Sequence, residues 1–149
     1  MSLLETIQKD AIKAAKSGNS VESDILKMLV AALKNAQIAK GQDEKMSDEE
    51  EVNIVFTESK KIRDSIEKFE SAGRDDLAKR EKEQLAVVEK YLPAQAEKDE
   101  IKEVVKKIIA DTGASNMGNM GMVMGTAMQE LQGRADGKVV SEVVKDLLS

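Results

Sequence analysis

Four basic side chains in the last third of the chain have the chemistry to contact phosphate groups: Lys106, Lys107, Arg134 and Lys138. Arg134 and Lys138 flank the turn G-R-A-D-G at 133–137, where a helix start would expose backbone N–H groups. Such N–H groups and cations together suit a phosphate of a nucleic acid. A plain solvated face is the competing interpretation, because acidic residues in the same stretch dilute the positive field.

Several kinds of catalytic site are excluded by residue type. The chain contains no cysteine and no histidine. This excludes a cysteine nucleophile, a disulfide, a Ser-His-Asp triad and any zinc site built from His or Cys. Neither G-x-x-x-x-G-K-S/T nor G-x-G-x-x-G occurs, so the phosphate-binding loops of nucleotide sites are also missing. We therefore expect no catalytic residues, no metal and no cofactor.

An acidic run, D-E-E-E at 48–51, is the one feature that could suggest a metal site. Four consecutive carboxylates point in different directions around a helix. They also suit the positive end of a helix dipole when they occupy the first turn. We interpret the run as a helix start.

Glycine and methionine cluster at 113–137, which holds six of the nine glycines and five of the eight methionines. If 117–132 is a helix, Gly118, Gly121 and Gly125 each cost roughly 1 kcal/mol relative to alanine. They fall along the edge of an apolar stripe, so a compensating contact is expected. That contact is either close packing against a neighbouring helix or a surface that an RNA backbone or a partner protein approaches.

The elements that must carry these residues are all helical by periodicity and capping. Apolar residues at spacings of three and four predict helices at 2–17, 20–39, 48–72, 75–92, 98–112 and 117–132, with a seventh after Asp136. The third and fourth helices carry facing seams and form a long antiparallel hairpin. Residues 40–46 show no period and are expected to form a mobile loop.

Pro93 disfavours helical geometry at the residue before it and predicts a domain boundary. The predicted fold is therefore all-α. An N-terminal four-helix domain at 1–93 contains the antiparallel hairpin, and a C-terminal three-helix bundle occupies 94–149.

The charge balance sets limits on partners. The formal net charge is −5, and it divides into −3 for 1–93 and −2 for 94–149, so neither part is a basic module. Any contact with nucleic acid would come from a local patch and be sensitive to salt. No apolar run approaches the length of a membrane span, and no signal-peptide pattern precedes the helices. We expect a cytoplasmic protein that does not bind membranes.

Three motifs and their order resemble the YqeY proteins: Y-L-P-A-Q at 91–95, G-M-V-M-G at 121–125 and G-R-A-D-G at 133–137. These proteins are stand-alone relatives of the tail domain of the B subunit of aspartyl/glutamyl-tRNA amidotransferase. The resemblance implies an N-terminal helical domain and a C-terminal three-helix domain of the GatB/YqeY type. It also implies a tail-domain role in holding tRNA. Family members are often assigned carbon–nitrogen ligase activity with glutamine as amido-N-donor. This sequence has Met122 where the family commonly has lysine.

Two functions from different classes follow. The first is a non-catalytic, tRNA-linked accessory protein that uses the basic patch of Lys106, Lys107, Arg134 and Lys138. The second is a helical protein–protein interaction module, unrelated to tRNA. In it, either the helix at 117–132, which we call the Met/Gly helix, or the antiparallel hairpin holds a helical partner. A third hypothesis is an enzyme that takes part in a glutamine-dependent amidation.

Overall fold

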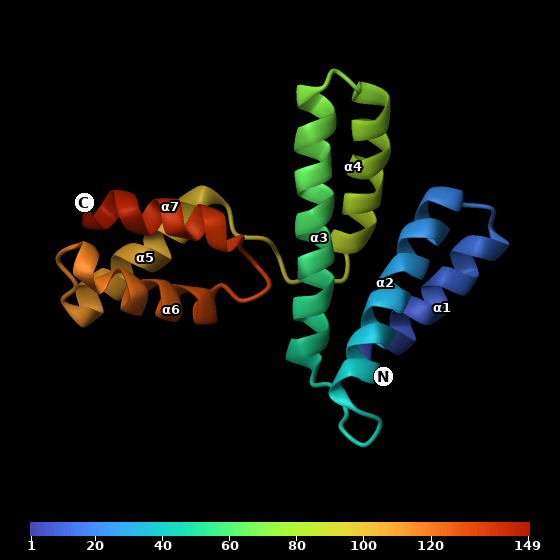
Figure 1. Ribbon diagram of the computed structural model, residues 1–149, viewed down its shortest axis with the longest axis horizontal. Helices are drawn as coiled ribbons and strands as arrows, with labels where there is room; N and C mark the ends of the chain where they lie inside the picture. The colour runs from blue at the N-terminus through green and yellow to red at the C-terminus, as the bar shows by residue number, and fades with distance from the viewer. The chain divides into compact units, whose positions relative to one another are not determined.

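A computed structural model describes residues 1–149 and is helical throughout, with no strand (Figure 1). The all-α class predicted from the sequence is confirmed. In chain order the elements are α1 (Leu3–Lys16), α2 (Ser20–Lys40), α3 (Asp48–Ser71), α4 (Asp75–Glu89), α5 (Lys98–Thr112), the 3₁₀ turn η1 (Met117–Asn119), α6 (Met120–Glu130) and α7 (Gly137–Leu148). Contacts divide the chain into two compact units, Met1–Pro93 and Ala94–Ser149. None of the helices combines the length and apolarity that a bilayer crossing requires.

The N-terminal unit consists of two helical hairpins, α1–α2 and α3–α4, which pack together chiefly through α2. Figure 1 shows α3 and α4 side by side and antiparallel. Their predicted seam is partly buried: Val55, Ser59 and Ile62 on α3 and Val88 on α4 are in the interior. The buried Ser59 hydroxyl donates to the Phe56 carbonyl at 2.6 Å, so it is satisfied within its own helix. The shared core also contains Ile7, Ala11, Ala14, Ile25, Leu26, Leu29 and Leu33 from the first hairpin.

The α4 helix ends at Glu89, three residues before the predicted limit. The chain then continues in the tighter 3₁₀ pattern: the N–H groups of Lys90, Tyr91 and Leu92 each donate to the carbonyl three residues earlier. This tightening follows from Pro93, because helical geometry is disfavoured at the residue that precedes a proline.

Polar contacts tie distant segments of the N-terminal unit together. Glu51, only 3% exposed, accepts the Leu4 N–H at 2.9 Å. The Tyr91 hydroxyl donates to the Asp10 carboxylate at 2.5 Å. Burial, and then the carboxylate of Asp10, raise the pKa of Tyr91 well above its usual range. The hydroxyl therefore remains protonated and acts as a structural donor.

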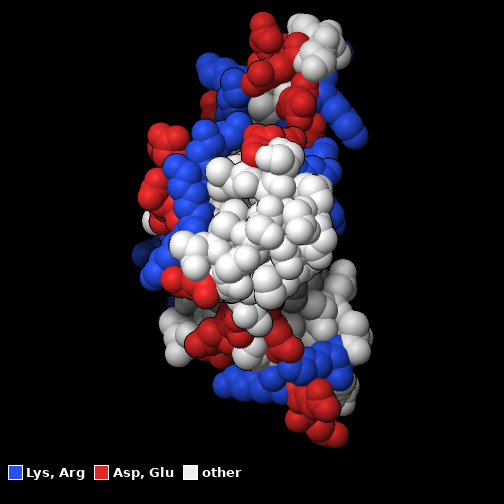
Figure 2. Space-filling view, turned by 90° about the vertical axis from the view of Figure 1, so that its left-hand side faces the viewer, with Lys and Arg blue, Asp and Glu red and all other residues white.

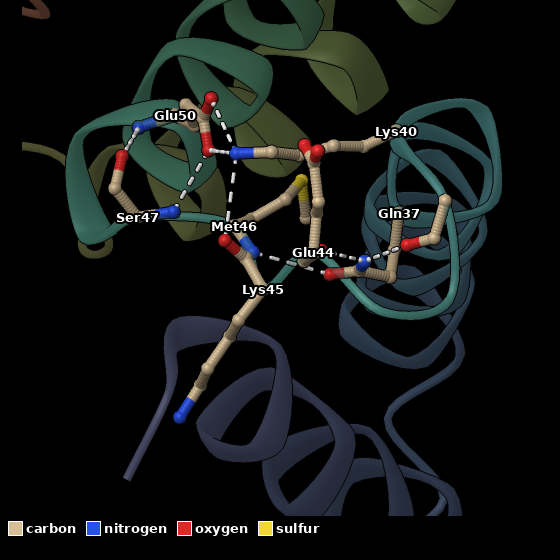
Figure 3. A network of polar contacts seen from close by, with 8 residues as sticks. Gln37, Lys40, Glu44, Lys45, Met46, Ser47 and Glu50 are labelled. Carbon is tan, nitrogen blue, oxygen red and sulfur yellow. Dashed lines mark hydrogen bonds and ion pairs between the residues drawn. The ribbon is translucent and has the colours of Figure 1, made fainter.

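The loop between α2 and α3 is held by a network of polar contacts (Figure 3). The Gln37 side-chain amide donates to the carbonyls of Gly41 and Glu44 at 3.0 and 2.6 Å, and its oxygen accepts the Met46 N–H at 3.3 Å. The Met46 side chain is buried. The sequence predicted a loop here, and the structure shows a loop that is bonded to the last turns of α2. The sequence pattern did not reveal that the side chain of Gln37 bonds three backbone groups of this loop.

The start of α3 completes this network. Ser47 and Glu50 form the predicted capping box, and the Lys40 ammonium lies 2.7 Å from the Glu50 carboxylate. The hydrogen bond from Lys40 is the main reason that the pKa of Glu50 lies below its usual value.

In the C-terminal unit, α5, α6 and α7 each contact the other two. The buried residues of this core include Ile101, Val105, Ile108, Val123, Ala127, Leu131, Val140, Val143 and Val144. The predicted limits of α5 are confirmed, and Gly113 ends the helix in a left-handed conformation with φ 71°. Asp136 caps α7 as expected.

Candidate functional site

The turn between α6 and α7, predicted as the centre of a phosphate site, is bonded to the segment that precedes α5. The Arg134 Nε donates to the Ala94 carbonyl at 2.7 Å, and one of its terminal nitrogens lies 2.5 Å from a Glu100 carboxylate oxygen. In the opposite direction, the Ala96 N–H donates to the Arg134 carbonyl at 2.8 Å. The Gln95 side-chain amide donates to the Gly133 carbonyl at the same distance. Through these contacts, Arg134 holds the turn against residues 94–100 at the start of the C-terminal unit.

Within this geometry, the turn already carries contacts of its own. The Arg134 side chain is only 29% exposed, and its charge is already opposed by Glu100. The Asp136 carboxylate accepts the Lys138 N–H at 3.0 Å, so it occupies the helix start at which a phosphate was expected. Arg134 is therefore held by contacts within the chain, and its contact with phosphate stays a prediction. Its partner Glu100 lies 34 residues away in sequence, and no local pattern indicated the pairing.

The three predicted lysines remain exposed. Lys106 on α5 has only a distant acidic neighbour, with its ammonium 3.9 Å from Glu103, while Lys107 and Lys138 form no ion pair. Lys107 is seven residues after Glu100, so it projects from the same side of α5 about 10 Å farther along the helix. Lys106 projects roughly 120° away from that side. The structure therefore leaves all three lysines exposed, two on α5 and one on α7.

The predicted helix at 117–132 is divided into η1 and α6. Its inner face is as expected, with Val123, Ala127 and Leu131 completely buried. A Cβ atom added at Gly121 or Gly125 would meet nothing within 4 Å. Close packing within the chain, the first explanation of these glycines, is therefore wrong, because both residues lie on the exposed side of α6.

Gly118 differs from the other two glycines. It lies in η1, where its N–H donates to the Asn116 side-chain oxygen at 2.8 Å. A Cβ atom at this position would lie 2.9 Å from the same oxygen. Here the glycine is explained by a local cap and not by a neighbouring helix.

The exposed side of η1 and α6 is uncharged. No charged residue occurs at 112–129, and Met117 and Met122 are 43% and 47% exposed. Figure 2 shows a broad area without charged side chains facing the viewer. We call the exposed residues Met117, Gly118, Gly121, Met122 and Gly125 the Met/Gly face.

The acidic run at the start of α3 is used structurally. Glu51 binds the Leu4 backbone and Glu50 binds Lys40, so the side chains diverge as expected for a helix start. Nowhere in the chain do three acidic side chains converge in a way that would hold a metal ion.

Comparisons with known proteins match the chain over nearly its whole length. A family model described as Yqey-like protein matches residues 4–148. Altered inheritance of mitochondria protein 41, mitochondrial, from Candida glabrata is 31% identical over 91 residues, which are 60% of this chain and 50% of that protein. Its namesake from Pyrenophora tritici-repentis is 29% identical over 98% of this chain and 81% of its own length.

A second group of relatives is much longer. A glutamyl-tRNA(Gln) amidotransferase subunit from Thermococcus gammatolerans is 56% identical over 45 residues. Those residues are 30% of this chain and 7% of the amidotransferase protein. The chain therefore corresponds to a small part of that protein and to half of the Candida relative.

Proposed function

Because the chain belongs to the YqeY family, we propose that it is a tRNA-linked accessory protein that binds RNA without catalysing a reaction on its own. The observation that carries the proposal is the likeness to an amidotransferase protein named for its tRNA substrate, at 56% identity over 45 residues. Only 7% of that protein is shared. This suits a binding role for the shared segment, with amide transfer carried out elsewhere.

The pKa shifts in this chain accompany structural contacts. The clear pKa displacements fall on Glu50, Asp76, Lys82 and Tyr91, each of which is displaced by an ion pair or by burial in the N-terminal unit. The two carboxyl groups become more acidic, while the lysine and tyrosine hold their protons more tightly. These displacements move the groups away from neutral pH, where a general acid or base operates.

RNA binding in this proposal uses the C-terminal unit. Lys106, Lys107 and Lys138 contact phosphates, and the Met/Gly face lets a sugar–phosphate backbone approach where Gly121 and Gly125 have no side chain. Arg134 keeps the turn before Lys138 in place through Ala94 and Glu100. With so few cations and a net charge of −5, the affinity would be modest and would fall steeply with salt.

Titration of labelled tRNA against the purified chain at several salt concentrations tests this proposal. The variant Lys107→Glu/Lys138→Glu should weaken binding tenfold or more and lower the salt slope by roughly 1 for each lost phosphate contact. Its matched control is Lys68→Glu/Lys79→Glu, which reverses two exposed, unpaired lysines of the N-terminal unit. Equal losses in both variants, or no tRNA binding by the wild-type chain, would refute the proposal.

A second candidate function, a helical interaction module, is favoured by the uncharged Met/Gly face. Exposed methionines adapt their shape to different partners, and the open glycines allow close approach of another helix. Association through this face would be insensitive to salt and abolished by Met122→Glu. RNA binding would instead weaken with salt and with Lys107→Glu/Lys138→Glu, a double substitution that association through this face would tolerate.

Two simpler measurements complete the test. Release of ammonia from glutamine by the purified chain would favour the ligase assignment associated with the family. The proposal also places the chain in the cytoplasm, whereas the names of its fungal relatives include the word mitochondrial. Cell fractionation distinguishes these locations.

A further inference from the structure

A groove runs between α1 and α2 within the N-terminal unit. Along α1, every third or fourth residue from Met1 faces it, in the order Met1, Glu5, Gln8, Ile12 and Ala15. This stripe borders the face of α1 that carries Ile7, Ala11 and Ala14 toward the core, and Ala11 lines the groove as well. With Lys27 and Val30 from α2, it encloses a groove of about 720 Å³.

The floor of the groove is apolar and exposed. Ile12 is 58% exposed and Met1 75% exposed, and both line the groove beside Ala15 and Val30. Single exposed apolar residues are common on protein surfaces, but several that converge on one concave surface indicate a binding site.

The rim of the groove carries cations that have no ion-pair partner. Residues 1–40 contain six lysines and four acidic residues, whereas the rest of the chain has 17 basic and 24 acidic residues. Two of those four acidic residues are engaged by α4 and its C-terminal end, since Asp10 binds the Tyr91 hydroxyl and Asp24 binds Arg80. The lysines that remain without an ion pair are Lys9, Lys13, Lys16, Lys27 and Lys34, of which Lys9 and Lys27 line the groove.

We infer that this groove binds an acidic amphipathic helix of a partner protein. The apolar face of the helix would cover Ile12 and Val30, and its Asp or Glu residues would lie opposite Lys9 and Lys27. The α1 helix has 14 residues, about 21 Å at 1.5 Å per residue, which provides a contact of three to four turns. A helix laid along two others in this way buries residues spaced at i, i+3, i+4 and i+7.

The lining favours a helix over the other ligands that lysines attract. Single-stranded RNA binds through aromatic stacking as well as charge, and neither an aromatic residue nor an arginine lines the groove. A membrane would have to desolvate Glu5 against lipid, whereas a helical partner can place a polar residue there. This inference is independent of the tRNA proposal, because its residues lie in the other unit.

Selection from a displayed library tests the inference. The library contains peptides of about 16 residues with helical spacing of apolar positions and all other positions randomised, and it is selected on the full-length chain. Recovered peptides should carry Asp and Glu beside the apolar stripe. They should bind the wild-type chain at least tenfold more tightly than Ile12→Glu or Lys9→Glu/Lys27→Glu, and binding should weaken as salt rises.

Matched controls separate the groove from the rest of the hairpin. Ile38 is 74% exposed on α2 and does not line the groove, so Ile38→Glu should leave peptide binding unchanged, as should Lys34→Glu. Circular dichroism checks the fold of each variant. Ala15→Glu, another exposed lining position, replaces Ile12→Glu if that variant does not fold.

Five outcomes would overturn the inference. The first is failure to enrich any peptide. The second is enrichment of peptides that bind the Ile12→Glu variant as tightly as the wild-type chain, or of peptides that lack acidic residues. The third is loss of tRNA binding in Lys9→Glu/Lys27→Glu, which would assign the surface to RNA. The fourth is flotation of the chain with anionic lipid vesicles that is lost in Ile12→Glu, which would assign it to membranes. The fifth is dimerisation in sedimentation experiments that Ile12→Glu abolishes, which would assign the groove to a second copy.

Discussion

The two hairpins of the N-terminal unit share an architecture but use their charges differently. In α3–α4, Arg63 pairs with Glu89 and Glu70 pairs with Lys82 across the two helices, at 3.2 and 2.8 Å. No ion pair links α1 to α2. Two ion pairs thus join the helices of the second hairpin to each other, whereas the unpaired lysines of the first remain available to a molecule outside the chain.

The cause lies in how the acidic residues of the first hairpin are used. Asp10 and Asp24 are bonded to Tyr91 and Arg80, from the second hairpin and its C-terminal end. These two acidic side chains thus join the two hairpins and form no ion pair with the lysines near them in sequence. An unpaired charge on one helix can therefore result from a tertiary contact made by its sequence neighbour.

Replacing a large side chain by alanine should change stability very differently on the two faces of the first hairpin, and this is the largest effect that we expect. Leu29 is fully buried, so Leu29→Ala should lower the free energy of unfolding by about 2–5 kcal/mol through lost burial and a cavity. Ile12→Ala, on the groove side, should change it by less than about 0.5 kcal/mol. Urea denaturation measures both. A comparable loss in Ile12→Ala would show that the groove stripe belongs to the core.

Removing the hydroxyl that joins the hairpins should have the next largest effect. Tyr91→Phe leaves the Asp10 carboxylate without this donor and should cost about 1–3 kcal/mol. Because the pKa of Tyr91 is raised in the folded state, the folded chain holds this proton more tightly than the unfolded chain. The stabilisation is therefore complete below the ordinary tyrosine pKa of about 10 and is lost as pH rises above it.

Unfolding experiments between neutral and strongly alkaline pH check this dependence. The wild-type chain should lose more stability above pH ~10 than Tyr91→Phe does. The chain has one tyrosine, so tyrosinate absorbance reports its titration directly. Parallel stability curves for the two proteins would contradict the assigned role of the hydroxyl.

The Met/Gly face of the C-terminal unit also lacks contacts within the chain at Gly121 and Gly125, and alanine substitution tests this. Gly121→Ala and Gly125→Ala should each raise the free energy of unfolding by about 0.5–1 kcal/mol, because a helical glycine is replaced where a Cβ atom has room. Gly118→Ala should not stabilise, since its Cβ would crowd the Asn116 cap. Thermal unfolding ranks the three. Destabilisation by Gly121→Ala would reveal a contact on that side of α6.

The ion pairs of the second hairpin should give the smallest effect. A double-mutant cycle of Arg63→Ala and Glu89→Ala should yield a coupling of about 0.2–1 kcal/mol, typical of exposed pairs. The cycle also removes the separate contribution of Arg63 over the Phe56 ring, at 6.0 Å. Lys9→Ala and Lys27→Ala should leave stability unchanged. A measurable loss there would indicate that these lysines already have a partner within the chain.

The helices could be predicted more fully than the candidate site. The start of α3 at the Ser47 capping box and the end of α5 at Gly113 follow from residues within one turn of each boundary. The role of Arg134 depended on Glu100 and Ala94, which are 34 and 40 residues away in sequence. The Met/Gly helix was predicted correctly as a helix, but periodicity could not decide between close packing and an open surface as the reason for its glycines, since it does not show what faces an edge.

The sequence by itself determined that this protein is all-helical, where most of its helices begin and end, and which faces are apolar. Those properties arise from hydrogen bonds and side chains no more than about four residues apart. Only the tertiary structure decided which charges are paired, which glycines are open and which lysines remain free. Each of these depends on segments that folding brings together from distant positions in the chain.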